Sequence, residues 1–263
     1  MNNDVKRIIN SSVLDIINNT SSDKKLKLLK KKHEEKIHFI PYKYRIFGGL
    51  LQSMNIQFGN FIEVLMTNII KNENKYEIIE KYSGKKSNKF ELSVKNDNLI
   101  DNYITKCQSE EVDLLKEFPL LLKQIVEDNS KETLKFKHDI DVLFKNKETK
   151  IIYYLEVKYN DDHDTGKFID INRKFIKTYA YLIKELNIKK SEEIVPILFF
   201  FTNKKMKGNI YIPEKLNIKR GKNFFEEFLS IKYDDVDNYM KNLSEKSDII
   251  KMFEELYKKV MEN

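Results

Sequence analysis

Apolar runs between residues 138 and 202 constrain the fold of this chain more than any other feature. The runs 138–144 and 150–158 are short, rich in β-branched and aromatic residues, and joined by a polar stretch, a pattern that predicts a β-hairpin. A polar loop (160–167) and a helix over 168–187 follow, and then the uninterrupted apolar run IVPILFFFT (194–202), which is typical of a strand buried on both faces. Strand, strand, helix and strand in this order predict an α/β fold.

Helical patterns occupy most of the remaining chain. Apolar residues at three- and four-residue spacing predict helices over 4–37, 44–72, 109–128, 222–231, 234–242 and 246–261. Pro41 separates the first two, and Gly48, Gly49 and Gly59 are points at which the second could be interrupted. Residues 76–100 have a mixed, turn-rich pattern, and 210–212 could form a short strand.

We expect one domain spanning 1–263. Its predicted parts are a helical N-terminal arm (1–43), a core (45–202), and a basic segment with C-terminal helices (203–263). A chain of this length can form one large domain or two smaller ones.

Positive charge is concentrated in two segments. The chain carries 48 Lys and Arg against 41 Asp and Glu, a net charge of +7. Residues 1–60 hold 11 basic and 5 acidic side chains, and residues 201–223 hold 7 basic side chains and only Glu214. Two basic patches suit a polyanionic partner such as nucleic acid, although lysines on an ordinary solvated surface explain them equally well.

Several classes of protein are excluded. The single cysteine, Cys107, excludes a disulfide framework and a cysteine-based zinc site. No phosphate-binding glycine motif is present, so ATP- or NAD-driven chemistry has no support. The sequence contains neither an apolar stretch long enough to span a membrane nor the pattern of a secretory signal, and we therefore expect no membrane association and a cytoplasmic location.

The predicted hairpin carries carboxylates at alternate positions. Alternate residues of a strand share a face, so Asp139 and Asp141 are expected to point one way, and Glu156 and Lys158 likewise. A hairpin centred on residues 148–149 puts Asp141 directly across from Glu156, at roughly 5 Å between Cβ atoms. Two carboxylates and an ammonium group would then converge on one patch.

Such a patch is suited to phosphodiester hydrolysis. Adjacent carboxylates repel unless a cation lies between them, and Mg²⁺ typically takes one or two carboxylates, several waters and substrate phosphate oxygens. A lysine beside them can orient an attacking water and offset charge at phosphorus. The alternative is an edge hairpin with an ordinary Glu–Lys pair on its solvent face, and for Asp139 a polar residue at a strand start is an equally good explanation.

The spacing of these residues resembles a known sequence pattern. Asp141, an interval of 14 residues and then Glu156-Val157-Lys158, followed by a helix and a strand, resembles the PD-(D/E)xK nuclease core. Within that superfamily the chain is similar to type II restriction endonucleases, and the block EVKYNDDHDTGKF together with the chain length resembles the HinfI/TdeIII type. The resemblance covers 45–202 best, and Ile140 stands where many such cores have proline.

The resemblance implies a fold and a site. The fold would be a restriction-endonuclease-like core, with a mixed central sheet flanked by helices, plus a helical N-terminal region. Asp141, Glu156 and Lys158 would be catalytic. Asp141, Glu156 and the backbone carbonyl of Val157 would bind Mg²⁺, for which Mn²⁺ can substitute. Such cores often add a glutamate from a preceding helix; Glu63 in GNFIEVL is the candidate, with a buried ion pair as its alternative role.

The resemblance also implies partners. They are double-stranded DNA cut to leave 5′-phosphate ends, a second copy of the chain in a homodimer, and a methyltransferase that protects host DNA. The HinfI type suggests a short interrupted palindrome such as GANTC. Two other functions stay open: a repair, junction or modification-dependent nuclease with the same core, and a DNA-binding protein without catalysis.

Basic residues near the hairpin are candidate DNA contacts. The loop 160–167 leaves the catalytic strand and opens a helix, so we expect it to lie along the DNA backbone. Asp161, Asp162 and Asp164 complicate this, because three carboxylates repel phosphate unless they are otherwise engaged; for Asp164 a helix cap is the alternative. The candidate contacts are Lys167, Arg173, Lys174, Lys204 and Lys205.

Overall fold

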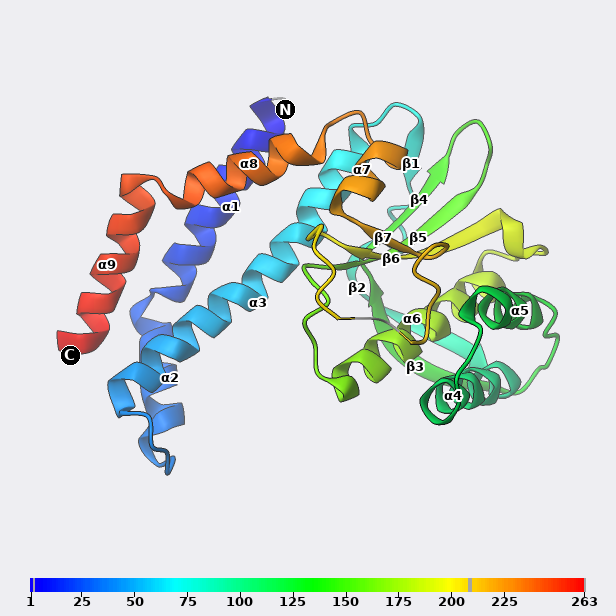
Figure 1. Cartoon of the computed structure of the whole chain (residues 1–263), viewed down its shortest axis with the longest axis horizontal. Helices are drawn as coiled ribbons and strands as arrows, with labels where there is room; N and C mark the ends of the chain where they lie inside the picture. The colour runs from blue at the N-terminus through cyan, green and yellow to red at the C-terminus, as the bar shows by residue number, and fades with distance from the viewer. Residues whose placement is uncertain (2, 208–209, 263) are drawn as a thin grey trace. The chain divides into compact units, whose positions relative to one another are not determined.

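The computed structural model describes Met1, residues 3–207 and residues 210–262. The chain forms two compact units, one of Met1–Leu65 with Ile231–Asn263 and the other of Met66–Ser230 (Figure 1). Helix α3 contributes to both. The boundaries of these units, after Leu65 and after Ser230, differ from the boundaries of the predicted parts 1–43, 45–202 and 203–263. The single-domain organisation stays a prediction.

The first unit is helical. Its helices are α1 (Asn3–Thr20), α2 (Asp23–Glu34), α3 (Tyr42–Lys71) up to Leu65, α8 (Tyr233–Ser244) and α9 (Ser247–Glu262). The predicted helix 4–37 is two helices that meet at Ser21 and Ser22. The glycines of α3 do not interrupt the helix. A Cβ at Gly48 or Gly59 would meet no other atom within 4 Å, whereas at Gly49 it would lie only 3.1 Å from a Leu29 methyl group of α2, so glycine lets the two helices approach closely there. The helical N-terminal region is confirmed.

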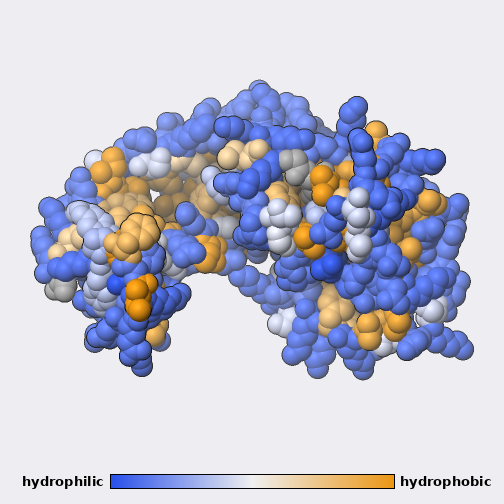
Figure 2. Space-filling model, turned by 60° about the horizontal axis from the view of Figure 1, so that its bottom comes forward, coloured by the Kyte–Doolittle hydropathy of each residue, from blue (hydrophilic) through white to orange (hydrophobic). Residues whose placement is uncertain are grey.

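An apolar hollow of about 270 Å³ lies within the first unit, lined by α1, α3, α8 and α9 through residues such as Ile17, Met54, Phe58 and Phe253. Charged residues make up 34% of the chain. Figure 2 shows a face that is mostly hydrophilic, with apolar side chains exposed in separate patches. Among the described residues, no helix is long and apolar enough to cross a membrane.

The second unit contains a five-stranded mixed sheet. Its strands are β1 (Tyr76–Ile78), β4 (Val142–Asn146), β5 (Ile152–Lys158), β6 (Ile194–Phe200) and β7 (Ile218–Arg220), in the order β1-β4-β5-β6-β7. The pairs β1–β4 and β4–β5 are antiparallel, and β5–β6 and β6–β7 are parallel. The parallel pair β5–β6 is joined through a helix, as parallel strands require. The predicted α/β fold class with a mixed central sheet flanked by helices is confirmed.

Helices cover both faces of this sheet. Helix α6 (Thr165–Glu185) packs on one face and α7 (Gly221–Phe228) on the other. Helices α4 (Val94–Ser109) and α5 (Leu114–Val126) pack against α6, and the 3₁₀ turn η1 (Ser191–Glu193) leads into β6. Because side chains alternate along β5, Tyr154 stacks on Phe175 of α6, while Tyr153 packs against Phe228 of α7 on the other face. The main apolar core lies on the α6 face.

A two-stranded antiparallel sheet, β2 (Gly84–Ser93) with β3 (Thr133–Ile140), adjoins this core. The predicted single strand 138–144 is wrong. The chain bends at Asp141 and passes from β3 in the two-stranded sheet to β4 in the five-stranded sheet. Two further expectations are wrong. The predicted helix 109–128 begins at Leu114, after a separate helix α4, and the edge strand lies at Ile218–Arg220 and not at 210–212.

Candidate active site

The site lies where β5 ends. The hairpin pairs Val142 with Leu155, so Asp141, the residue before β4, stands across from Glu156. This is the register predicted from the sequence. The Asp141 carboxylate is held in place because its Oδ2 accepts the backbone N–H of Val157 at 2.7 Å.

Lys158 joins the two carboxylates. Its Nζ lies 2.7 Å from Glu156 Oε1 and 3.5 Å from Asp141 Oδ2, and it donates to the backbone carbonyl of Val157 at 2.9 Å. The structure thus brings together Asp141, Glu156 and Lys158, the three residues that the sequence pattern singled out. Strand alternation explains the meeting, since Glu156 and Lys158 share a face of β5.

Glu156 is ionised despite its burial. Its side chain is almost wholly enclosed, with the residue only 6% exposed. Burial alone raises the pKa of this carboxyl, but the Lys158 ammonium and the hydrogen bonds to the carboxylate outweigh burial, so the pKa is lowered from its ordinary value. The site therefore holds a charged carboxylate in a position that is largely shielded from water.

The oxygen atoms present fit a hard divalent cation. Two carboxylates and the carbonyl of Val157 converge on the point now taken by the Lys158 ammonium, and Mg²⁺ prefers such oxygen ligands while keeping several waters. In the described part of the chain no cluster of three or more His, Cys, Asp and Glu is arranged for a metal. Water and phosphate oxygens can complete the ligand set of such an ion.

Asp139 and Glu63 are the two less direct candidates from the sequence. Asp139 is in β3, and its Oδ1 accepts the backbone N–H of Ser87 at 2.6 Å, so it fastens β2 to β3. The sheet change at Asp141 breaks the alternation that grouped Asp139 with Asp141. Glu63 is half-buried in the part of α3 that belongs to the first unit, and its metal-binding role stays a prediction.

Two residues beside the site were missed from the sequence. The Tyr154 hydroxyl donates to Glu156 Oε2 at 3.0 Å, and His138 Nε2 of β3 lies 4.0 Å from the same oxygen. Burial lowers the pKa of His138, which favours the neutral imidazole. Tyr154 could have been found, because it is two residues before Glu156 and thus on the same face of β5.

The three aspartates of the loop after β5 are engaged within the protein. Asp161 is only 1% exposed; its carboxylate pairs with Arg220 at 2.9 Å and accepts the backbone N–H of Met206 at 2.9 Å. Asp162 pairs with Lys207 at 3.3 Å, and Asp164 caps α6. These contacts fasten the loop to the basic segment, and the alternative reading of Asp164 as a helix cap is confirmed.

The predicted DNA contacts differ in their surroundings. Lys167 and Lys204 are exposed. The other three lie in ion pairs: Arg173 with Asp101 at 2.9 Å, Lys174 with Asp170 at 2.9 Å, and Lys205 with Glu214 at 3.5 Å. Contact with phosphate would require these three to exchange one anion for another. The DNA-binding roles of all five stay predictions.

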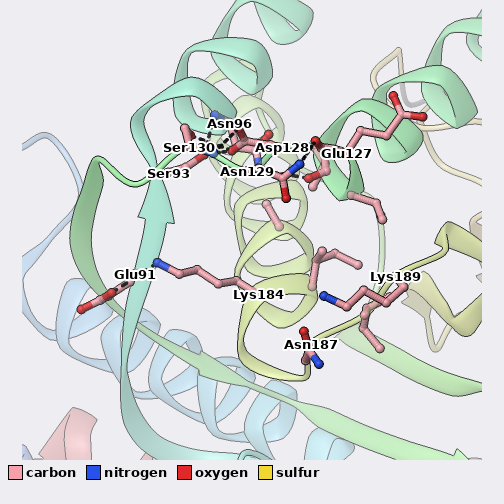
Figure 3. Close-up of a pocket in the computed structure, with 15 residues that line it drawn as sticks. Glu91, Ser93, Asn96, Glu127, Asp128, Asn129, Ser130, Lys184, Asn187 and Lys189 are labelled. Carbon is pink, nitrogen blue, oxygen red and sulfur yellow. Dashed lines mark hydrogen bonds and ion pairs between the residues drawn. The ribbon is translucent and has the colours of Figure 1, made fainter.

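A separate hollow of about 460 Å³ lies between β2, α4, α5 and α6 (Figure 3). Asp128 accepts from the hydroxyls of Ser93 and Ser130, and Ser93 in turn caps α4. These polar groups satisfy one another, so their arrangement is explained by helix capping. The predicted catalytic residues do not line this hollow.

Comparisons with known proteins identify the family of the chain. A family model described as "Type II restriction endonuclease, HinfI" matches residues 1–244. The chain is 62% identical over 262 residues to the type II restriction enzyme HinfI of Haemophilus influenzae, covering 99% of each chain. No solved structure matches. Type II restriction enzymes cut DNA at specific sequences and generally use a divalent metal ion. The chain belongs to the HinfI family of type II restriction endonucleases.

Proposed function

We propose that this chain cuts double-stranded DNA by Mg²⁺-dependent hydrolysis at Asp141, Glu156 and Lys158, leaving 5′-phosphate ends. The observation that carries the proposal is the meeting of both carboxylates with one ammonium group at the end of β5. When bound, Mg²⁺ supplies Lewis-acid polarisation of the phosphate and a more acidic water, and Mn²⁺ can substitute. Asp141, Glu156 and the carbonyl of Val157 would hold it, with Glu63 as a further candidate.

The chain's own residues have distinct tasks in this proposal. The Val157 N–H fixes the direction of the Asp141 carboxylate, and the strand fixes Glu156 beside it. Lys158 keeps the Glu156 carboxylate ionised before the metal binds, and it can then orient the attacking water and offset charge at phosphorus. Burial of Glu156 strengthens each of these electrostatic interactions.

Family membership also supports the proposed partners. We infer a homodimer acting on a short interrupted palindrome of the GANTC kind, a methyltransferase that protects host DNA, and a cytoplasmic location, where such DNA lies. High identity to a restriction enzyme along the whole chain favours restriction over a repair, junction or modification-dependent nuclease. The charged site favours catalysis over DNA binding alone.

Sequencing the ends of digested plasmid DNA tests the proposed activity. Discrete fragments that all end at one short palindrome are expected with Mg²⁺, and intact DNA is expected with EDTA. A smear would contradict sequence specificity. Intact DNA with Mg²⁺ and with Mn²⁺ would contradict catalysis and leave a binding protein.

The basic segment makes a separate prediction. If Lys204 and Lys205 contact phosphates, the double variant Lys204→Gln/Lys205→Gln should bind all DNA sequences more weakly, because counterion release carries no sequence information. The slope of log affinity against log salt should fall by about 0.9 per lost contact. Fluorescence anisotropy in EDTA measures both quantities.

The matched control is Lys147→Gln/Lys150→Gln, which removes the same charge from the turn of the hairpin, at the opposite end of β5 from Lys158. It should leave the salt slope unchanged. Equal slopes for the two double variants would show that Lys204 and Lys205 are ordinary solvated residues.

A further inference from the structure

The two oxygens of the Glu156 carboxylate have different partners. Oε1 accepts from Lys158 at 2.7 Å, and Oε2 accepts from the Tyr154 hydroxyl at 3.0 Å. His138 Nε2 lies 4.0 Å from Oε2. One oxygen is therefore directed to the lysine and Asp141, and the other toward Tyr154 and β3.

Tyr154 is held rigidly. Its side chain is fully buried, and its ring stacks on Phe175 of α6 with 5.2 Å between ring centroids and 26° between planes. A buried tyrosine hydroxyl normally has a hydrogen-bond partner, and here that partner is the carboxylate two residues along the same strand. The position of the hydroxyl is thus set by β5 and α6 together.

The torsion that rotates a glutamate carboxylate is intrinsically soft. Terminal sp³–sp² torsions have broad, roughly two-fold profiles, so the backbone and the Cγ position do not determine which oxygen faces the metal. Lys158 alone does not settle the question, because its flexible ammonium can follow either oxygen. A fixed donor on one oxygen does settle it.

We propose that Tyr154 is a positioning residue for the reaction: by holding Oε2, its hydroxyl presents Oε1 of Glu156 to the divalent metal. The inference rests on the proposed function, in which Glu156 is a metal ligand. Groups that hydrogen-bond to a metal-binding side chain orient it, and their removal typically costs roughly 10- to 100-fold in metal affinity or activity.

Tyr154→Phe tests this proposal by removing one oxygen atom and keeping the ring. Mn²⁺ alone, added to the full-length protein without DNA and followed by electron paramagnetic resonance of the free ion, should bind roughly 10-fold or more weakly than to the parent. The Mg²⁺ concentration for half-maximal cleavage should rise by a similar factor. The KM for DNA should not change, because Tyr154 is buried beneath the site.

Tyr179→Phe is the matched control. Tyr179 is also fully buried in the same core, on α6, and among the described residues its hydroxyl has no hydrogen-bond partner. This control should bind Mn²⁺ within about two-fold of the parent. If Tyr154→Phe does not fold, Tyr154→Met fills the space with an adaptable apolar chain and still lacks the donor.

The outcomes separate the inference from the proposed function. If Tyr154→Phe binds Mn²⁺ like Tyr179→Phe while Glu156→Gln has lost binding, the positioning role is wrong and the metal site stands. If Glu156→Gln binds Mn²⁺ and cuts like the parent, the proposed function itself fails. Weak binding by Tyr154→Phe with normal binding by Tyr179→Phe supports the positioning role.

Discussion

Asp141→Asn and Glu156→Gln are each expected to abolish DNA cleavage. Each variant removes one negative charge from the proposed metal site, and a bound metal contributes several kcal/mol to catalysis, so a loss of about 4 kcal/mol corresponds to roughly 10³-fold in rate. The fold should persist, because the asparagine in place of Asp141 can still accept the N–H of Val157. Single-turnover cleavage of plasmid DNA measures the effect.

Glu148→Gln is the control for this pair. Glu148 begins a second Glu-x-Lys tripeptide, ending at Lys150, in the exposed turn of the same hairpin. Its replacement should leave the cleavage rate unchanged. DNA binding in EDTA should be close to that of the parent for all three variants, and cooperative thermal unfolding should show that each variant is folded. A Glu156 variant that cuts as fast as the Glu148 variant would refute the assignment of the site.

Asp161→Ala is expected to destabilise the protein strongly, by about 3 kcal/mol in the free energy of unfolding. Removing one partner of a buried ion pair leaves an uncompensated charge, which typically costs about 3–5 kcal/mol. The lower end applies because Arg220 keeps a second anion, Glu214, 2.7 Å from its Nε. The variant also deprives the Met206 N–H of its acceptor.

Urea unfolding of Asp161→Ala beside Asp162→Ala measures this difference. Asp162 is an exposed neighbour in the same loop, and its pair with Lys207 lies at the surface, where such pairs contribute about 0–1 kcal/mol. Similar midpoints for the two variants would show that the Asp161–Arg220 pair does not stabilise the fold.

Local patterns were sufficient to predict the hairpin and the meeting of its candidate catalytic residues. Strand alternation has a period of two, so placing Asp141 and Glu156 on one face specifies the register, and the structure has that register. The helix after the loop and the apolar strand β6 follow from equally local signals. Asp141, Glu156 and Lys158 therefore meet as the sequence predicted.

Features that depend on distant contacts were not predictable in this way. The alternation of residues 138–144 continues through the bend at Asp141, so nothing local marks the change of sheet. The partner of Asp161 is Arg220 on another strand, and no spacing rule connects them. Tyr154 is an intermediate case: strand alternation puts it on the same face as Glu156, but a tyrosine in a buried strand is normally a core residue, so its hydrogen bond to Glu156 was missed.

Anomalous diffraction from Mn²⁺ bound to the protein with a DNA duplex tests the central claim most directly. If these residues hold the metal, a Mn²⁺ peak is expected within about 2.0–2.3 Å of carboxylate oxygens of both Asp141 and Glu156, with the carbonyl of Val157 also in contact. Lys158 should lie beside it, displaced from its present position between the carboxylates. A Mn²⁺ ion bound elsewhere, with Asp141 and Glu156 still paired with Lys158, would contradict the account.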